Sequence, residues 1–62
     1  MTKQQALIIL NDTDIIDVSN DYYASFNTIV NIHTLTNGGR LVIDTNLDNN
    51  VVNYTYRIEH ME

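Results

Sequence analysis

Hydrophobic and polar residues alternate with a period of two between residues 26 and 35. Phe26, Thr28, Val30, Ile32 and Thr34 alternate with Asn27, Ile29, Asn31, His33 and Leu35. Period two over this length predicts a β-strand. The segment ends at Thr36-Asn37-Gly38-Gly39, where Asn-Gly suits the positive φ angles of a two-residue type I′ turn. The pattern therefore predicts a β-hairpin.

A second hairpin is predicted where the strand Arg40 to Leu47 meets the turn Asp48-Asn49-Asn50, since Asn tolerates left-handed backbone better than most residues. With Asn37-Gly38 and Asn49-Asn50 as the loop residues, Thr34 lies opposite Leu41 and Arg40 lies opposite Glu59. One face then gathers Val30, Ile32, Leu41, Ile43, Leu47, Val52, Tyr54, Tyr56 and Ile58. Because both turns place the apolar side chains on the same face, the sequence predicts a three-stranded antiparallel meander over about residues 26–60.

Residues 13–25 show a helical rather than a two-residue period. At 100° per residue, one arc holds Ile15, Ile16, Val18, Tyr22, Tyr23 and Phe26, and the other holds Asp14, Asp17, Asn20, Asp21 and Ala24. This predicts an amphipathic helix, capped by Asp12 or Thr13, packed on one face of the sheet. Asp, Asn, Ser and β-branched residues are poor helix formers. The alternative is a short strand at residues 15–18 followed by a turn at residues 19–21.

The segment Gln5 to Leu10 is apolar on all sides of a helical wheel and on both parities of a strand, which favours a buried strand. Thr2 followed by Gln5 resembles a capping box, so a short N-terminal helix is the alternative. The resulting β-α-β-β-β order predicts a small α+β domain over residues 1–62, whose first strand pairs in parallel through a right-handed crossover. An all-β meander or barrel is the other candidate fold.

One helix can cover only one face of such a sheet. Apolar side chains would then face outward, namely Ile8 or Leu10, Ile29, Leu35, Val42 and Val51. An exposed apolar patch of this kind usually marks a partner surface. The pattern therefore favours a homodimer, formed through the open face or through an edge strand.

Composition limits how the domain can be stabilised. The chain has 62 residues and no cysteine, so its core is thin and no disulfide can reinforce it. Two histidines, His33 and His60, are too few for a structural zinc site. Self-association is the remaining means of stabilisation.

The formal charge is −5, with eight acidic residues against three basic ones. Nucleic-acid binding depends on cations that replace counterions, so direct nucleic-acid binding is not expected. A protein partner with a basic surface is electrostatically favoured.

The longest apolar run, Ala6 to Leu10, is too short to span a bilayer, and no basic segment precedes a signal-like stretch. A cytoplasmic location without membrane association is expected.

Three groups of residues are candidate functional sites. The aspartates of residues 12–21 lack the spacing of a calcium loop and read as the solvated face of the predicted helix. His33, Asp44 and Arg57 would lie near one another on the outward face, without a pocket. The tyrosines read as packing residues rather than as base-stacking platforms, because cations are scarce.

No catalytic residue, cofactor site or metal ligand is therefore predicted. The candidate partner-binding residues are Asp12, Asp14, Asp17, Asp21, Ile29, His33, Val42 and Arg57. The favoured function is a non-enzymatic interaction protein that inhibits or modulates a larger partner by occluding it, a profile typical of small acidic inhibitors from phages or mobile elements, which would act in the host cytoplasm. The alternative is an assembly module whose self-association is the function. A third hypothesis is catalysis by His33 with Asp44.

Overall fold

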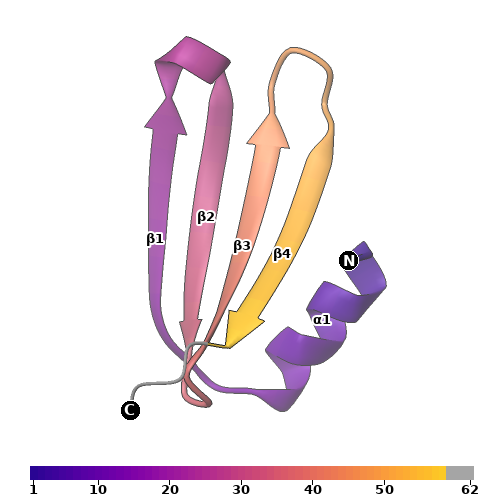
Figure 1. Cartoon of the computed structure of the whole chain (residues 1–62), viewed down its shortest axis with the longest axis vertical. Helices are drawn as coiled ribbons and strands as arrows, with labels where there is room; N and C mark the ends of the chain where they lie inside the picture. The colour runs from indigo at the N-terminus through magenta and orange to yellow at the C-terminus, as the bar shows by residue number, and fades with distance from the viewer. Residues whose placement is uncertain (59–62) are drawn as a thin grey trace.

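The computed structural model describes residues 1–58 (Figure 1). The chain begins with helix α1 (Lys3–Asp12) and continues through strand β1 (Ile15–Tyr23), the 3₁₀ turn η1 (Ala24–Phe26) and strands β2 (Thr28–Leu35), β3 (Gly39–Asn46) and β4 (Val52–Ile58). The strands form one antiparallel sheet in the order β1-β2-β3-β4. The α+β class is confirmed, but the element order is α-β-β-β-β.

The N-terminal segment is a helix, as its capping box indicates, and the predicted strand at residues 5–10 is wrong. The Thr2 hydroxyl accepts a hydrogen bond from the Gln5 backbone N–H (3.2 Å), and the Gln5 side chain accepts one from the Thr2 N–H (2.9 Å). This reciprocal pair satisfies two donors at the helix N-terminus. The capping box favours a helix here, and the isoleucines of this segment oppose it only weakly, because their helix propensity is only slightly below average.

Residues 15–23 form an edge strand, so the helix predicted over residues 13–25 is wrong. The alternative of a strand from residue 15 is closer, although the strand runs straight through residues 19–21. β-branched residues, Asn, Ser and Asp disfavour a helix interior, and pairing with β2 satisfies the backbone along one side of the strand. The turn back follows through η1 and Asn27, whose φ of 46° is left-handed. The predicted parallel crossover is therefore also wrong, because β1 pairs antiparallel with β2.

The hairpin of β2 and β3 is present, but its register differs by one residue from the prediction. Thr34 lies opposite Arg40, not Leu41, and His33 lies opposite Leu41. The loop therefore has three residues, of which Gly38 (φ 83°) takes the positive φ and Asn37 accepts a hydrogen bond from the Gly39 N–H at 2.8 Å. A one-residue change moves every side chain of β2 to the other face relative to β3.

The hairpin of β3 and β4 differs by two residues from the prediction, which leaves the faces unchanged. Ile43 lies opposite Tyr54 and Leu41 lies opposite Tyr56, so these side chains share one face as predicted. Arg40 lies opposite Arg57 rather than Glu59. Glu59 lies outside the described residues.

These registers define two faces. The helix face carries the side chains that include Leu35 and Leu41, which are 1% and 0% exposed. Its other members are Ile15, Val18, Asn20, Tyr22, Ile29, Asn31, His33, Gly39, Ile43, Thr45, Val52, Tyr54, Tyr56 and Ile58. The open face carries the alternate side chains. Ile29 and Leu35 thus point toward the helix side, contrary to the prediction, whereas Val42 lies on the open face as predicted.

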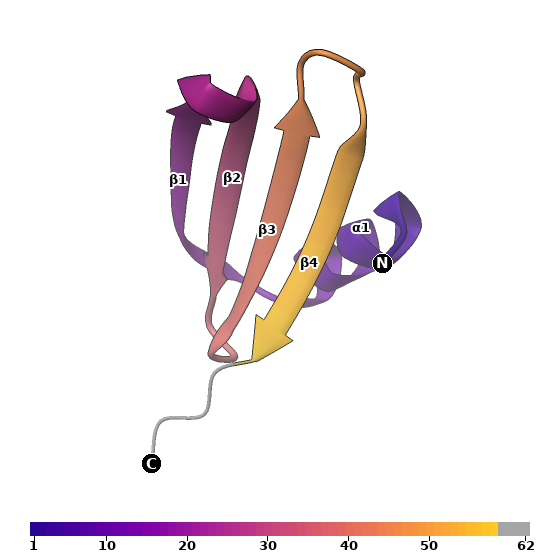
Figure 2. The same ribbon diagram turned by 45° about the horizontal axis from the view of Figure 1, so that its top comes forward.

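The core is confined to one end of the helix face. Ala6 of α1 is 1% exposed and, with Leu35 and Leu41, makes up the buried hydrophobic core of the described residues. In Figure 2, β4 passes in front of α1, so the helix lies behind the sheet near that edge. Of the described residues, thirteen large apolar ones remain more than a third exposed, including Ile16 (64%) and Phe26 (73%). So small a core leaves much apolar surface available for contact with another chain.

Candidate functional site

The open face is built from four rows of side chains that run across the strands. From the η1 end, they are Tyr23-Thr28-Asn46, then Asp21-Val30-Asp44-Asn53, then Ser19-Ile32-Val42-Thr55, then Asp17-Thr34-Arg40-Arg57. Side chains directly opposite on neighbouring strands are about 5 Å apart. The two middle rows thus place Val30, Ile32, Val42 and Asp44 on the central strands, with polar side chains on the edge strands.

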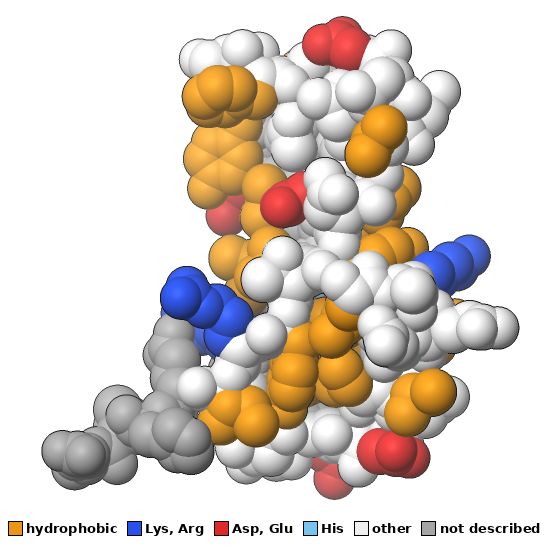
Figure 3. All heavy atoms as spheres, turned by 45° about the vertical axis from the view of Figure 1, so that its right-hand side comes forward, with side chains coloured by type: hydrophobic (Ala, Val, Ile, Leu, Met, Phe, Trp, Pro, Cys, Tyr) orange, Lys and Arg blue, Asp and Glu red, His pale blue; other side chains and the backbone are white. Residues whose placement is uncertain are grey.

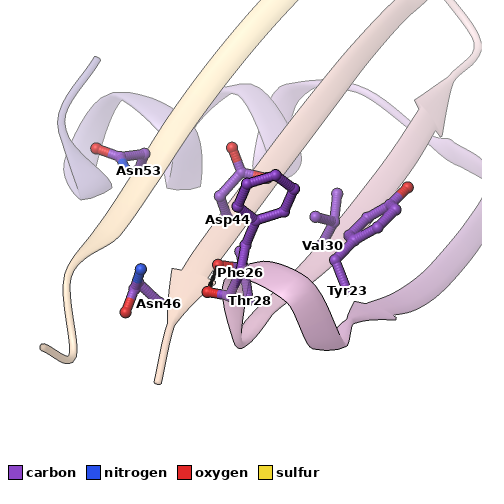
Figure 4. Close-up of a pocket in the computed structure, with 7 residues that line it drawn as sticks. All are labelled: Tyr23, Phe26, Thr28, Val30, Asp44, Asn46 and Asn53. Carbon is purple, nitrogen blue, oxygen red and sulfur yellow. Dashed lines mark hydrogen bonds between the residues drawn. The ribbon is translucent and has the colours of Figure 1, made fainter. Parts of the chain in front are cut away.

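A shallow groove of about 460 Å³ occupies the η1 end of this face. Its lining residues are Tyr23, Phe26, Thr28, Val30, Asp44, Asn46 and Asn53. Figure 4 shows the aromatic rings on the same side of the sheet as Asp44, with α1 behind the strands. Phe26 is 73% exposed, and exposure of a large apolar side chain to water is costly.

Local hydrogen bonds hold the two sides of the groove. The Thr28 hydroxyl donates to the Phe26 carbonyl (2.8 Å), and the Asn46 side-chain oxygen accepts from the Asp48 N–H (2.9 Å). The Asn27 side chain donates a hydrogen bond to Asp48 (2.7 Å), which links the connection between β1 and β2 to the turn between β3 and β4. The groove therefore has a polar side on β3 and β4, where Asn46 is held by its hydrogen bond, and an aromatic side on β1 and η1.

Charge is unevenly shared between the open face and the rest of the chain. The open face carries Arg40 and Arg57 with Asp17, Asp21 and Asp44, so its formal charge is −1, whereas the whole chain has −5. Figure 3 shows basic side chains at the left and at the right of this view, with hydrophobic side chains exposed between them. Two of the three basic residues thus lie on the open face, at the end opposite the groove.

The two edges of the sheet differ. At β4, the Met1 ammonium group donates to the Tyr54 carbonyl (3.4 Å), and α1 lies alongside the strand. At β1, eight of nine residues are exposed. A bulge between Ile15 and Asp17 interrupts the start of β1. The free side of β1 therefore presents backbone donors and acceptors that another strand can pair with.

The candidate partner-binding residues do not form one surface. Asp17, Asp21, Val42 and Arg57 share the open face, whereas Ile29 and His33 lie on the helix face. The other two lie near the connection between helix and sheet. Asp12 ends α1, and the Asp14 carbonyl accepts a hydrogen bond from the Thr36 N–H (3.0 Å). The helical acidic face predicted for residues 12–21 is wrong, because only Asp17 and Asp21 point the same way.

His33 is not on the outward face, contrary to the prediction. It lies between Val18 and Leu41 on the helix face, and its Nδ1 atom is buried without a hydrogen-bond partner among the described residues. Asp44 and Arg57 are on the opposite face. The sheet therefore separates His33 from Asp44, and the groove contains only the aspartate.

Sequence reasoning missed the groove. The helical spacing predicts that Tyr23 and Phe26 lie on the inner side of a helix, and no pattern singles out Asn46 or Asn53. The signal for the aromatic side of the groove is the alternation in β1, where residues 17, 19, 21 and 23 fall on one face of a strand. Residues 1–58 contain no cluster of three or more metal-binding side chains.

Comparison of the chain with protein-family models, curated proteins and solved structures finds no match. In the described part of the chain, no helix has the length and hydropathy needed to cross a membrane.

Proposed function

We propose that this chain is a non-enzymatic protein-interaction domain that modulates or inhibits a larger partner by covering part of its surface. The observation that carries the proposal is the β1 edge, a nine-residue strand with eight exposed residues. A partner strand can extend the sheet there, since main-chain hydrogen bonds give affinity and alternate side chains give specificity.

The chemistry of this edge selects the kind of partner. β1 carries Asp17 and Asp21 on the open face and Val18 and Tyr22 on the helix face. A partner strand with basic residues on one side and apolar residues on the other complements both sets. Pairing of β1 with a second β1 would bring these aspartates together, and like charges directly opposite are destabilising. The edge thus favours a basic partner over self-pairing.

The test is affinity capture from cells of the source, with the full chain as bait. We expect a stoichiometric protein partner for the wild type and a weaker yield with Asp17→Asn/Asp21→Asn. Gln4→Lys/Asn11→Lys is the matched control, since it changes the net charge by the same two units at exposed positions of α1. Repeated capture of the bait alone would count against the proposal, as would equal loss with the control pair.

Hydrogen exchange then locates the contact. With the captured partner bound, we expect slower exchange at β1 amides and little change at β4, whose edge already lies beside α1. Protection of β4 alone would place the contact at the other edge and contradict the role given to β1.

The second candidate function is assembly, in which self-association is itself the activity. The uncovered open face supports it. Sedimentation separates the two candidates, since a closed dimer fits a modulator, whereas growth of the particle with concentration indicates an open assembly.

A further inference from the structure

We infer that the open face is the interface of a twofold symmetric homodimer whose axis runs parallel to the strands. A second copy is the occupant because, under this one rotation, Ile32 meets Val42 and Asp17 meets Arg57 of the other copy. This goes beyond the proposed function, in which the partner pairs with the β1 edge and, of the open-face side chains, contacts only Asp17 and Asp21. The dimer would carry two β1 edges, both still accessible.

The rotation exchanges β1 with β4 and β2 with β3 while keeping each row at its own level. A contact of this kind is isologous, so each matched pair of residues occurs twice. In the third row, Ile32 then meets Val42 of the second copy, which forms an apolar centre from four side chains. Aligned sheets pack this way about 10 Å apart, with strands within about 30° of one another.

The charged row matches under the same rotation. Asp17 on β1 and Arg57 on β4 lie at opposite ends of the fourth row, so each aspartate meets Arg57 of the second copy. In the second row, Asp21 meets Asn53 of the second copy, whose amide can donate to it. The formal charge of −1 on the open face, compared with −5 for the chain, leaves little repulsion across the interface.

The groove fits the same arrangement. Its aromatic side belongs to β1 and η1, and its polar side, Asp44, Asn46 and Asn53, belongs to β3 and β4. The rotation places the aromatic side of one groove against the polar side of the groove of the other copy. The exposed Phe26 of each copy therefore enters the groove of the other. Burial of this exposed side chain removes apolar surface from water and so favours the dimer.

The other in-plane twofold axis, across the strands, does not produce these matches. It places the fourth row against the first, so Asp17 meets Tyr23 and Arg40 meets Asn46 of the second copy. No ion pair forms, and the aromatic side of the groove meets Asp17 and Thr34 instead of the polar side. The two axes therefore predict different partners for Asp17.

The area of the open face reaches the lower bound for a specific dimer. Strands of eight residues at about 3.3 Å per residue and four strands about 4.8 Å apart give about 500 Å² per copy. Two copies together cover about 1,000 Å², which is the lower bound for a biological interface. The additional area of the exposed Phe26 side chain is not included in this figure. The helix face offers no such plane, since α1 occupies one end of it.

The test is charge reversal across the axis, measured by sedimentation equilibrium of the full chain over a hundredfold range of concentration. We expect a discrete dimer for the wild type and dissociation constants at least tenfold higher for Asp17→Arg and for Arg57→Asp. The double variant Asp17→Arg/Arg57→Asp restores the pair and should return to within about threefold of the wild type. Failure of the double variant to recover would overturn the inferred axis.

Apolar variants test the face independently of charge. Val42→Glu should abolish the dimer, whereas Ile8→Glu, at a helix position that is 58% exposed, should leave it intact. Circular dichroism shows whether each variant keeps the sheet. A monomeric wild type, growth beyond a dimer, or a dimer that survives Val42→Glu would each overturn the inference. A monomeric Val42→Glu variant that still captures the partner separates this inference from the proposed function.

Discussion

Leu41 occupies the centre of a core with very few members. It is 0% exposed and lies between His33 and Tyr56 on the helix face. We expect Leu41→Ala to raise the free energy of the folded state by about 2–5 kcal/mol, because it removes buried methyl groups and leaves a cavity. Urea denaturation at a fixed protomer concentration measures the change.

Ile16→Ala is the matched control for this substitution. Ile16 is 64% exposed, so its truncation should change the unfolding free energy by about 0.5 kcal/mol or less. Equal effects of the two truncations would mean that Leu41 is not the centre of the core.

Gly39 lies where a side chain has no room. A Cβ atom there would be 2.8 Å from Cε1 of Tyr56 and 2.8 Å from Oδ1 of Asn37. The Asn37 amide donates to the Tyr56 hydroxyl at 2.8 Å, so Gly39→Ala must displace the ring and break this bond. We expect a loss of about 1–3 kcal/mol, measured by thermal or urea unfolding.

A double-mutant cycle identifies the cause of that loss. In a Tyr56→Val background the obstructing ring is absent, so Gly39→Ala should be less harmful than in the wild type. A cost that is unchanged by Tyr56→Val would assign the effect to the backbone instead.

At the scale of elements, α1 depends on its N-terminal cap more than on its packing. The helix has ten residues, of which only Ala6 is buried, and isolated helices of this length are marginal in water. We expect Thr2→Ala to destabilise the helix by about 0.5–2 kcal/mol. Hydrogen exchange should show faster opening of α1 amides with little change in β2 and β3.

Thr2→Ser keeps the hydroxyl and should keep the protection of α1. Faster exchange across the whole sheet after Thr2→Ala would show that the helix and the sheet unfold together.

The elements that local chemistry specifies were predictable from the sequence, and those that depend on tertiary pairing were not. The alternation in residues 26–35 and the turns that follow identify β2, β3 and β4. The capping box of Thr2 and Gln5 also indicates α1, although the apolar run favoured a strand. For residues 15–23, helical spacing and strand pairing both place apolar side chains together, and only the pairing with β2 decides between them.

The face of each side chain was the least predictable feature of the site. Asn37-Gly38 suggested a two-residue loop, whereas Asn37 uses its side chain to accept from Gly39 and the loop takes one residue more. That residue moves His33 to the helix face and Val30 to the open face. The residues that line the groove and the rows of the open face both depend on this register.

For the whole molecule, the thin core and the open face imply that folding and dimerisation are linked. Partner subunits that bind only the folded state raise its apparent stability with concentration. For a folded dimer in equilibrium with unfolded monomers, each tenfold increase in protomer concentration adds about 1.4 kcal/mol to apparent stability. We therefore expect the thermal midpoint of the wild type to rise steadily with concentration, and that of Val42→Glu to be lower and independent of it. Calorimetry over a hundredfold concentration range measures both, and a wild-type midpoint that does not move would show that the chain folds without a second copy.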